Sequence, residues 1–309
     1  GIAICSPGWA CVRRRVPTEA WHTTAMPDPH NKITLLSSGI DPRKVKRSFA
    51  RAAASFDGAD FLQTEVRNRL LERLKWLRLE PQRVLDLGTG TGRALPALAA
   101  RFPTAELIAL DLTEDMLKVA ARREGASPLT VCGNASHLPL ADASVDMVFS
   151  SLMIHWCTSL DSLFAEVRRV LRYPGVFSFA TLGPGSFREL REAWQTVDDD
   201  AHVMRFPEMT ALGNGLLRAG LTEPVIDVET LTICYADLRQ LTTDLRSTGT
   251  TNPNSGRRQG LTGRRSWARL EAAYGEQRDA NGALPVTLEM VFGAAWAKPP
   301  AGSGSQLRD

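Results

Sequence analysis

The sequence is poor in cysteine, and its five cysteines are scattered, without a Cys-x-x-Cys pair. An odd, dispersed set argues against a disulfide framework and against a zinc site, so we expect no metal and a reducing compartment, the cytoplasm. Long apolar runs are also missing, and none approaches the ~20 residues that a membrane-spanning helix requires. We therefore expect no membrane association.

The chain has no excess of charge that would attract a nucleic acid. Its formal net charge is +3, and three arginines and one glutamate before Met26 contribute +2 of it. The remainder is close to neutral, so bulk charge gives nucleic-acid binding no support. The 309 residues, 43% hydrophobic and 23% charged, are enough for one large or two small globular domains.

Two phosphate-binding motifs are absent from the most informative segment, Val84-Leu-Asp-Leu-Gly-Thr-Gly-Thr-Gly92. A dinucleotide-binding loop needs a third glycine at position 93, where the chain has Arg93, and a Walker loop needs Gly-Lys-Ser/Thr. Three glycines at alternate positions still let a ligand lie directly against the backbone. The segment therefore predicts a nucleotide-cofactor site of another kind, or a plain strand-to-helix turn of some other α/β protein.

Apolar patterning predicts an α/β fold with a doubly wound parallel sheet, whose core covers residues 41–185 and begins with a helical cover. Short buried strands are expected at residues 84–87, 107–110, 129–132, 145–149 and 176–180, with helices between them. Ligands of such sheets bind beyond the carboxyl ends of the strands. The glycine loop, Asp111, Asn134 and Ser150 all fall there, which predicts a common site.

The segments outside this core have weaker patterns. Residues 1–40 show no clear period and are expected to be a disordered extension. Residues 186–275 are predicted to form a mostly helical lid with a strand near residues 225–235. Residues 276–298 are expected to supply a C-terminal strand that closes the sheet as an antiparallel edge, and residues 299–309 a flexible tail.

Asp111 follows the second predicted strand at about the distance where an acid meets ribose hydroxyls in nucleotide-binding α/β folds. Its two oxygens can accept both hydroxyl protons. The alternative is helix capping, because Asp111 or Thr113 could cap a helix that begins near residue 114. Met116 and Leu112 could form an apolar wall against an adenine, although a methionine on a helix is as readily a core residue.

The glycine loop resembles motif I of the class I S-adenosylmethionine-dependent methyltransferases. The resemblance implies that Asp86 holds the methionine ammonium of S-adenosylmethionine, directly or through water. It also implies that the turn containing Gly88, Thr89, Gly90 and Gly92 passes beneath the methionine and the ribose. We therefore expect a Rossmann-like methyltransferase sheet with S-adenosylmethionine as its cofactor.

The next two strand ends extend this resemblance. Asn134 and Ala135 stand where methyltransferases often place Asp-Ala against the adenine, and the Asn134 amide oxygen can still accept a hydrogen bond, without charge assistance. Ser150, His155 and Trp156 follow the fourth strand and are expected on the path between donor and acceptor. His155 could act as a general base, or as a packed or orienting histidine.

Further segments carry a more specific resemblance. They include Val45-Lys-Arg-Ser-Phe-Ala-Arg-Ala-Ala-Ala-Ser-Phe56, Phe149-Ser-Ser-Leu-Met-Ile-His-Trp-Cys157, Asp244-Leu-Arg-Ser-Thr-Gly-Thr-Thr-Asn252 and Leu284-Pro-Val-Thr-Leu-Glu-Met-Val-Phe-Gly293. Across residues 41–298 the chain resembles the malonyl-acyl-carrier-protein O-methyltransferases of biotin synthesis, the BioC family. It departs from the family pattern at Phe56, Ser151, His155 and Leu288, where Tyr, Asn, Gln and Tyr are usual.

The family resemblance implies methyl transfer from S-adenosylmethionine to the free carboxylate of a malonyl thioester. The thioester would be malonyl-acyl-carrier protein or malonyl-coenzyme A, and the methyl ester would prime pimeloyl synthesis. An arginine is expected to steer the carboxylate, and its place in His202-Val-Met-Arg-Phe206 favours Arg205, which could alternatively form a surface or structural ion pair. Two other functions stay open: methylation of another small acid, quinone or polyketide precursor, or a non-catalytic partner protein.

Overall fold

The computed structural model describes residues 12–15, 39–255, 257, 260 and 262–299. The extension predicted over residues 1–40 and the tail predicted over 299–309 lie almost wholly outside the described residues. Within the extension, Val12–Arg15 form strand β1, which pairs with strand β7. Regular structure at these four residues differs from the prediction, because they complete the backbone hydrogen bonds of an otherwise free sheet edge.

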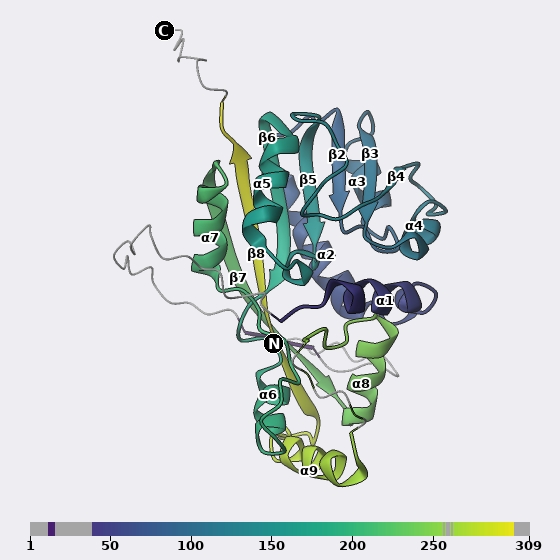
Figure 1. The fold of residues 1–309 in the computed structure, drawn as a ribbon, viewed down its shortest axis with the longest axis vertical. Coiled ribbons are helices and arrows are strands. Elements are labelled where there is room, and N and C mark those ends of the chain that lie inside the picture. The colour runs from purple at the N-terminus through teal and green to yellow at the C-terminus, as the bar shows by residue number, and fades with distance from the viewer. Residues whose placement is uncertain (1–11, 16–38, 256, 258–259, 261, 300–309) are drawn as a thin grey trace.

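One eight-stranded sheet, in the order β1-β7-β8-β6-β5-β2-β3-β4, organises the described chain (Figure 1). The strands after β1 are β2 Arg83–Leu87, β3 Glu106–Asp111, β4 Leu129–Cys132, β5 Val145–Ser151, β6 Leu171–Leu182, β7 Leu221–Tyr235 and β8 Leu284–Ala297. Strands β4, β3, β2, β5 and β6 are mutually parallel. The predicted α/β class and parallel order of the core are confirmed.

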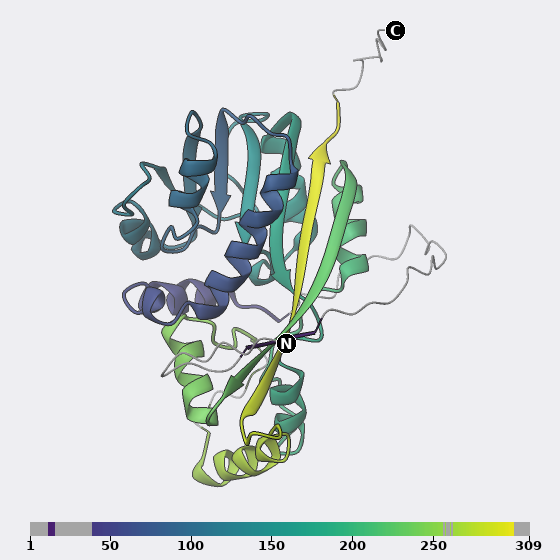
Figure 2. The same ribbon diagram turned by 180° about the vertical axis from the view of Figure 1, so that it is seen from behind.

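Helices cover both faces of this sheet. They are α1 Pro42–Ala52, α2 Phe61–Arg73, α3 Leu95–Arg101, α4 Glu114–Ala120, α5 Leu160–Val170, α6 Arg188–Gln195, α7 Met209–Arg218, α8 Leu238–Ser247 and α9 Arg264–Gly275, with 3-10 turns at Phe56–Gly58, Leu74–Trp76 and Ile154–Trp156. Successive residues of β2 alternate between two cores: Val84 packs in the cluster with α2 and α3, and Leu85 in the cluster with α5 and α7. Figure 1 shows α5 and α7 on one face, and Figure 2 shows α2 crossing the other.

The C-terminal strand does not form the edge that the sequence predicted. β8 runs antiparallel to β6 but lies between β6 and β7, so that β7 rather than β8 is the outer strand of the core sheet. The mainly apolar, buried sequence of β8 fits this central place, because a strand paired on both sides has both faces covered. Position within a sheet depends on long-range pairing, which local pattern does not encode.

Helix α7 belongs to the core and not to the lid predicted over residues 186–275. Its buried Leu212 and Leu216, four residues apart, lie on one helix face and pack with Phe164 of α5 and Leu221 of β7. The adjoining half of β7 pairs with the part of β8 that also pairs with β6. Residues 209–228 therefore complete the sheet layer.

The true lid is a second lobe built on the far ends of two long strands. Pairing of β6 with β8 stops at Leu182 and Met290, whereas β7 and β8 stay paired as far as Tyr235 and Leu284. This extension, on which β1 pairs with residues 230–233 of β7, leaves the main sheet and is wrapped by α6, α8 and α9 (Figure 1). Buried Glu189 of α6 accepts a hydrogen bond from the Thr287 backbone N–H at 2.9 Å, which ties the lobe together.

Helix α1 closes the junction between the two lobes (Figure 2). It begins after Asp41, whose carboxylate accepts hydrogen bonds from the N–H groups of Arg43 and Lys44, as an N-cap should. Ser48 of α1 donates to the Gly249 carbonyl at 2.9 Å, and Ser55 donates to the Ser247 carbonyl at 2.9 Å. The N-terminal cover is thus fastened to the loop after α8.

Candidate active site

The glycine loop lies at the carboxyl end of β2 and is tied to β3. The Gly88 N–H donates to the Leu110 carbonyl at 2.8 Å, and the Gly90 N–H donates to an Asp111 carboxylate oxygen at 3.0 Å. Gly88 and Gly90 have φ of +76° and +56°, which side-chain-bearing residues rarely adopt. A Cβ on Gly88 would collide with Met153, whereas a Cβ on Gly90 would meet nothing within 4 Å. The loop therefore offers open backbone at Gly90.

Asp111 supports the start of α4 and also lines the cavity described below. One carboxylate oxygen accepts from the Thr113 N–H at 2.8 Å and the Thr113 hydroxyl at 2.9 Å, and the other accepts from Gly90. Thr113 is the N-cap of α4 but its side chain makes no capping bond. Burial raises the pKa of Asp111, and the hydrogen bonds from Thr113 and Gly90 oppose this rise. Asp111 thus supports the helix start and still reaches the cavity described below.

Asp86 lies beneath the loop and not on the cavity wall. Its carboxylate is buried and accepts a hydrogen bond from the Thr89 hydroxyl at 2.6 Å. Burial raises the pKa of Asp86 to about 7, and the nearby charge of Asp111 adds to the rise, while Thr89 and Arg67 oppose it. A cation placed above the loop would therefore favour the ionised carboxylate, so that Asp86 can act through its field or through a water.

A cavity of about 520 Å³ opens at the carboxyl ends of the parallel strands, between the core and the second lobe. The predicted site residues that line it are Gly88, Gly90, Asp111, Leu112, Met116, Asn134, Ala135, His155 and Trp156. Those that do not are Asp86, Thr89, Gly92, Ser150 and Arg205. The structure therefore gathers the three predicted strand ends around one space.

The proposed adenine contacts lie together on one wall of the cavity. Met116 is a buried core residue that also lines the cavity, as Leu112 does, and the adenine contact stays a prediction. The Asn134 amide oxygen accepts a hydrogen bond from the Ser136 N–H at 2.9 Å. Because an amide oxygen has two lone pairs, one acceptor site of Asn134 stays available to a ligand.

Ser150, which was predicted to contact the cofactor, does not line the cavity. It is fully buried, and its hydroxyl donates to the Leu87 carbonyl at 2.9 Å, which braces β5 against the start of the glycine loop. Ser151 lines the cavity instead. Successive side chains of a strand point to opposite faces, so a prediction one residue out of place moves the side chain across the sheet.

His155 is a packed histidine rather than a poised base. Its ring is buried, and its Nδ1 lies 2.9 Å from the Thr181 hydroxyl. The ring also lies against Trp156 and Phe206, with centroids 5.2 Å and 5.5 Å away. Burial lowers the pKa of His155 to about 3, so the ring is neutral near pH 7. The geometry supports an orienting role for His155, with Trp156 forming cavity wall.

Arg205 does not reach the cavity. Its side chain is exposed, although its neighbours Met204 and Phe206 line the cavity wall. The cations that line the cavity within the described chain are Arg246 and Arg257, both in the second lobe. The assignment of Arg205 to the acceptor is therefore not supported by this geometry.

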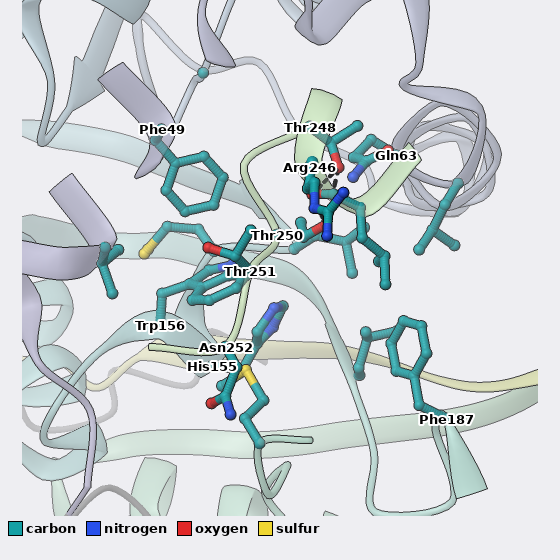
Figure 3. A pocket seen from close by; sticks show the side chains of 18 of the residues that line it. Phe49, Gln63, His155, Trp156, Phe187, Arg246, Thr248, Thr250, Thr251 and Asn252 are labelled. Carbon is teal, nitrogen blue, oxygen red and sulfur yellow. Dashed lines mark hydrogen bonds between the residues drawn. The ribbon is translucent and has the colours of Figure 1, made fainter. Parts of the chain in front are cut away.

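Sequence reasoning missed the residues that the cover and the second lobe contribute (Figure 3). Figure 3 shows Phe49 and Gln63 from the cover, Phe187 from the start of α6, and Arg246 and the loop after α8 around the same cavity as His155 and Trp156. The loop residues are Thr248, Thr250, Thr251 and Asn252. The family-like segments at residues 45–56 and 244–252 contain most of them, which was the available signal.

Comparison with known proteins identifies the family. A methyltransferase domain family matches residues 85–179. The malonyl-[acyl-carrier protein] O-methyltransferase of Gallionella capsiferriformans (strain ES-2) is 42% identical over 269 residues, which are 84% of this chain and 92% of that protein. The chain belongs to this family of O-methyltransferases. It is accordingly an S-adenosylmethionine-dependent methyltransferase.

Two further similarities agree with this membership. The biotin biosynthesis bifunctional protein BioHC of Cellvibrio japonicus is 39% identical over 257 residues, which are 83% of this chain and 50% of that protein. Among solved structures, the YcgJ protein from Bacillus subtilis superposes with a TM-score of 0.55 at 18% identity, over 75% of this chain and 99% of that chain. This last similarity shows the shared Rossmann-like fold alone.

The residues of this methyltransferase fit the methionine nucleoside that the family uses. The Gln63 side-chain oxygen is buried and has no hydrogen-bond partner among the described residues, yet Gln63 lines the cavity. A buried acceptor without a donor is costly, and an ammonium group would satisfy it. Together with the open backbone at Gly90 and the carboxylate of Asp111, it forms a set of groups matched to an amino-acid-bearing nucleoside.

Asp198, Asp200 and His202 place three potential metal-ligand atoms within 4.8 Å of one another. These groups already have local partners: His202 Nε2 lies 2.6 Å from an Asp198 oxygen, and its ring stacks on Trp194 with centroids 3.5 Å apart.

None of the helices formed by the described residues combines the length and apolar character that crossing a bilayer demands.

Proposed function

We propose that this enzyme methylates the free carboxylate of a malonyl thioester carried on an acyl-carrier protein, to give the methyl ester that primes pimeloyl synthesis for biotin. The observation that carries the proposal is the continuity of one cavity of about 520 Å³. The glycine loop and Asp111 line it on the donor side, and residues of the second lobe line it on the acceptor side. The family to which the chain belongs supports the choice of acceptor.

On the donor side, this chain supplies recognition groups for S-adenosylmethionine, which provides a sulfonium methyl group. Asp111 would accept a ribose hydroxyl at the acceptor site that remains on the oxygen bonded to Gly90, because the other oxygen already accepts two hydrogen bonds from Thr113. Leu112 and Met116 would pack against the adenine. The unpartnered oxygen of Gln63 would accept from the ammonium group.

On the acceptor side, the reaction requires positioning more than proton transfer. A malonyl carboxylate has a pKa well below neutral and is already an anion, so it needs no general base. The neutral, buried His155 agrees with this requirement. The chain's task is to align the carboxylate oxygen with the methyl carbon and to exclude the water that would hydrate both charges.

Aromatic side chains supply that exclusion. Phe49 of α1 meets Trp156 edge-to-face, with ring centroids 5.1 Å apart and planes at 88°. Phe187 and Phe206 stack with centroids 6.2 Å apart on the lobe side. The methyl-transfer site would thus lie between an aromatic cover and an aromatic lobe, where charge neutralisation between donor and acceptor is favoured over hydration.

The test is methyl transfer from labelled S-adenosylmethionine to defined acceptors. Malonyl-acyl-carrier protein, malonyl-coenzyme A, free malonate and acetyl-acyl-carrier protein would be compared at equal concentration. We expect label on the malonyl thioesters only, released by mild base as methanol, because the bond formed is an ester. Label that resists base, label on the acetyl thioester, or donor binding without transfer to either malonyl thioester would contradict the proposal.

A further inference from the structure

Arg246 is a solvent-exposed cation on the cavity wall that the reaction as described so far does not use. It lies in the last turn of α8 and lines the cavity wall. Figure 3 shows it with Thr248 and Gln63 on a different side of the cavity from His155. We propose that Arg246 binds the carboxylate of the acceptor and so selects an anionic acyl group, an inference that rests on the proposed function.

Two arginines of the described chain line the cavity, Arg246 and Arg257, and of these Arg246 is the one carried by a helix. Many arginines elsewhere are paired: Arg69 with Glu229, and Arg123 with Asp57 at 2.7 Å. The guanidinium of Arg246 has no ion pair or hydrogen bond to any residue that the structure describes. Asp244 lines the same cavity but shares a hydrogen bond with Tyr235. A cation without a counterion that faces a cavity is ready to receive an anionic ligand.

The backbone around Arg246 is fixed, so its guanidinium starts from a defined place. The Gly249 N–H donates to the Arg246 carbonyl at 3.0 Å, and Gly249 has φ of +72°, which ends the helix sharply. Thr248 donates to the Asp244 carbonyl at 3.0 Å, and its hydroxyl lies 2.8 Å from that of Thr250. The turn is further held by the hydrogen bonds from Ser48 and Ser55 already described.

Guanidinium chemistry matches the acceptor. A planar guanidinium can give two parallel N–H bonds to one carboxylate, a geometry that an ammonium group cannot reproduce. The rival role for Arg246 is structural, because any cation in the last turn of a helix interacts favourably with the helix dipole. Lysine would fill that structural role equally well, so the two roles predict different behaviour of Arg246→Lys.

The test uses Arg246→Gln and Arg246→Lys, with Arg239→Gln as the matched control. Arg239 lies in the first turn of the same helix, is exposed and does not line the cavity. For each variant, the inhibition constant of the neutral methyl-ester product would be compared with the KM of the ionised malonyl thioester. Calorimetry would give the dissociation constant of S-adenosylmethionine. We expect wild type to prefer the ionised thioester at least tenfold, and Arg246→Gln to lose this preference and raise KM ~10- to 100-fold.

Donor affinity of Arg246→Gln should stay within about twofold of wild type, which also reports correct folding. Arg246→Lys should recover only part of the preference for the anion, and Arg239→Gln should match wild type. The inference is overturned if Arg246→Gln keeps the preference, if Arg246→Lys restores it fully, or if Arg257→Gln abolishes it instead. If the wild-type enzyme is active and Arg246→Gln behaves like it, only the role of Arg246 is rejected. If the wild-type enzyme methylates no malonyl thioester, the proposed function is rejected as well.

Discussion

Replacing Asp111 by alanine should cost the enzyme most of its affinity for S-adenosylmethionine. In the structure this carboxylate accepts hydrogen bonds from Gly90 and Thr113 and still faces the cavity. A hydrogen bond to a charged group contributes about 1.5–3 kcal/mol, so loss of the ribose contact removes about that much. The dissociation constant of the donor should therefore rise roughly 10- to 100-fold. Asp111→Asn keeps one acceptor oxygen and should raise it roughly tenfold.

Isothermal titration with S-adenosylmethionine and with S-adenosylhomocysteine would measure this loss. Asp115→Asn is the control, because Asp115 lies in the first turn of α4, the helix that follows Asp111. Its side chain is exposed and forms an ion pair with Lys118. The two ligands should lose affinity to the same extent, since both carry the ribose. A dissociation constant for Asp111→Ala within twofold of wild type would refute the assignment of the ribose to this carboxylate.

Three further predictions follow from the loop and the buried groups. Gly88→Ala should lower the free energy of unfolding by ~2 kcal/mol or more in denaturant titrations, because the added methyl collides with Met153. The methyl group added by Gly90→Ala would contact no neighbour, so this change should lower the free energy of unfolding less than Gly88→Ala but weaken donor binding in calorimetry. Equal losses in the free energy of unfolding would contradict this. The kcat/KM profile of His155→Gln should parallel wild type between pH 6 and 8, since the pKa of His155 is about 3, and a lost ionisation near pH 6.5 would identify a base. Burial raises the pKa of Asp86 to about 7, so its contribution to stability is present below pH 4 and lost as pH rises to 7. Relative to Asp86→Asn, the free energy of unfolding of the ligand-free enzyme should fall by on the order of 4 kcal/mol over that pH range. If the difference between the two proteins does not change with pH, the burial of this charge is contradicted.

Much of the core could be predicted because its signals are local. The strand β2, its glycine loop and the acid at the end of β3 each follow from short apolar runs and from residues with special backbone freedom. Parallel strands then bring their carboxyl ends to one edge, which placed Asp111 and Asn134 in one cavity. The central position of β8 could not be read in this way, because it depends on pairing between residues far apart in the chain.

The acceptor side was harder to predict for the same physical reason. Ser150 differs from Ser151 only in strand parity, whereas Arg205 lies exposed before α7 and Arg246 lines the cavity from the last turn of α8. Gln63 shows its importance only once its oxygen is seen buried without a partner among the described residues. Such features arise from packing between lobes, which periodicity in one segment does not report.

A crystal structure of the enzyme with S-adenosylhomocysteine tests most directly whether this cavity is the site of methyl transfer. We predict a ribose hydroxyl within hydrogen-bond distance of Asp111, the adenine beside Leu112 and Met116, and the sulfur facing Trp156. The Gln63 oxygen should accept from the ammonium group. Electron density for the nucleoside outside this cavity, or a ribose turned away from Asp111, would contradict it.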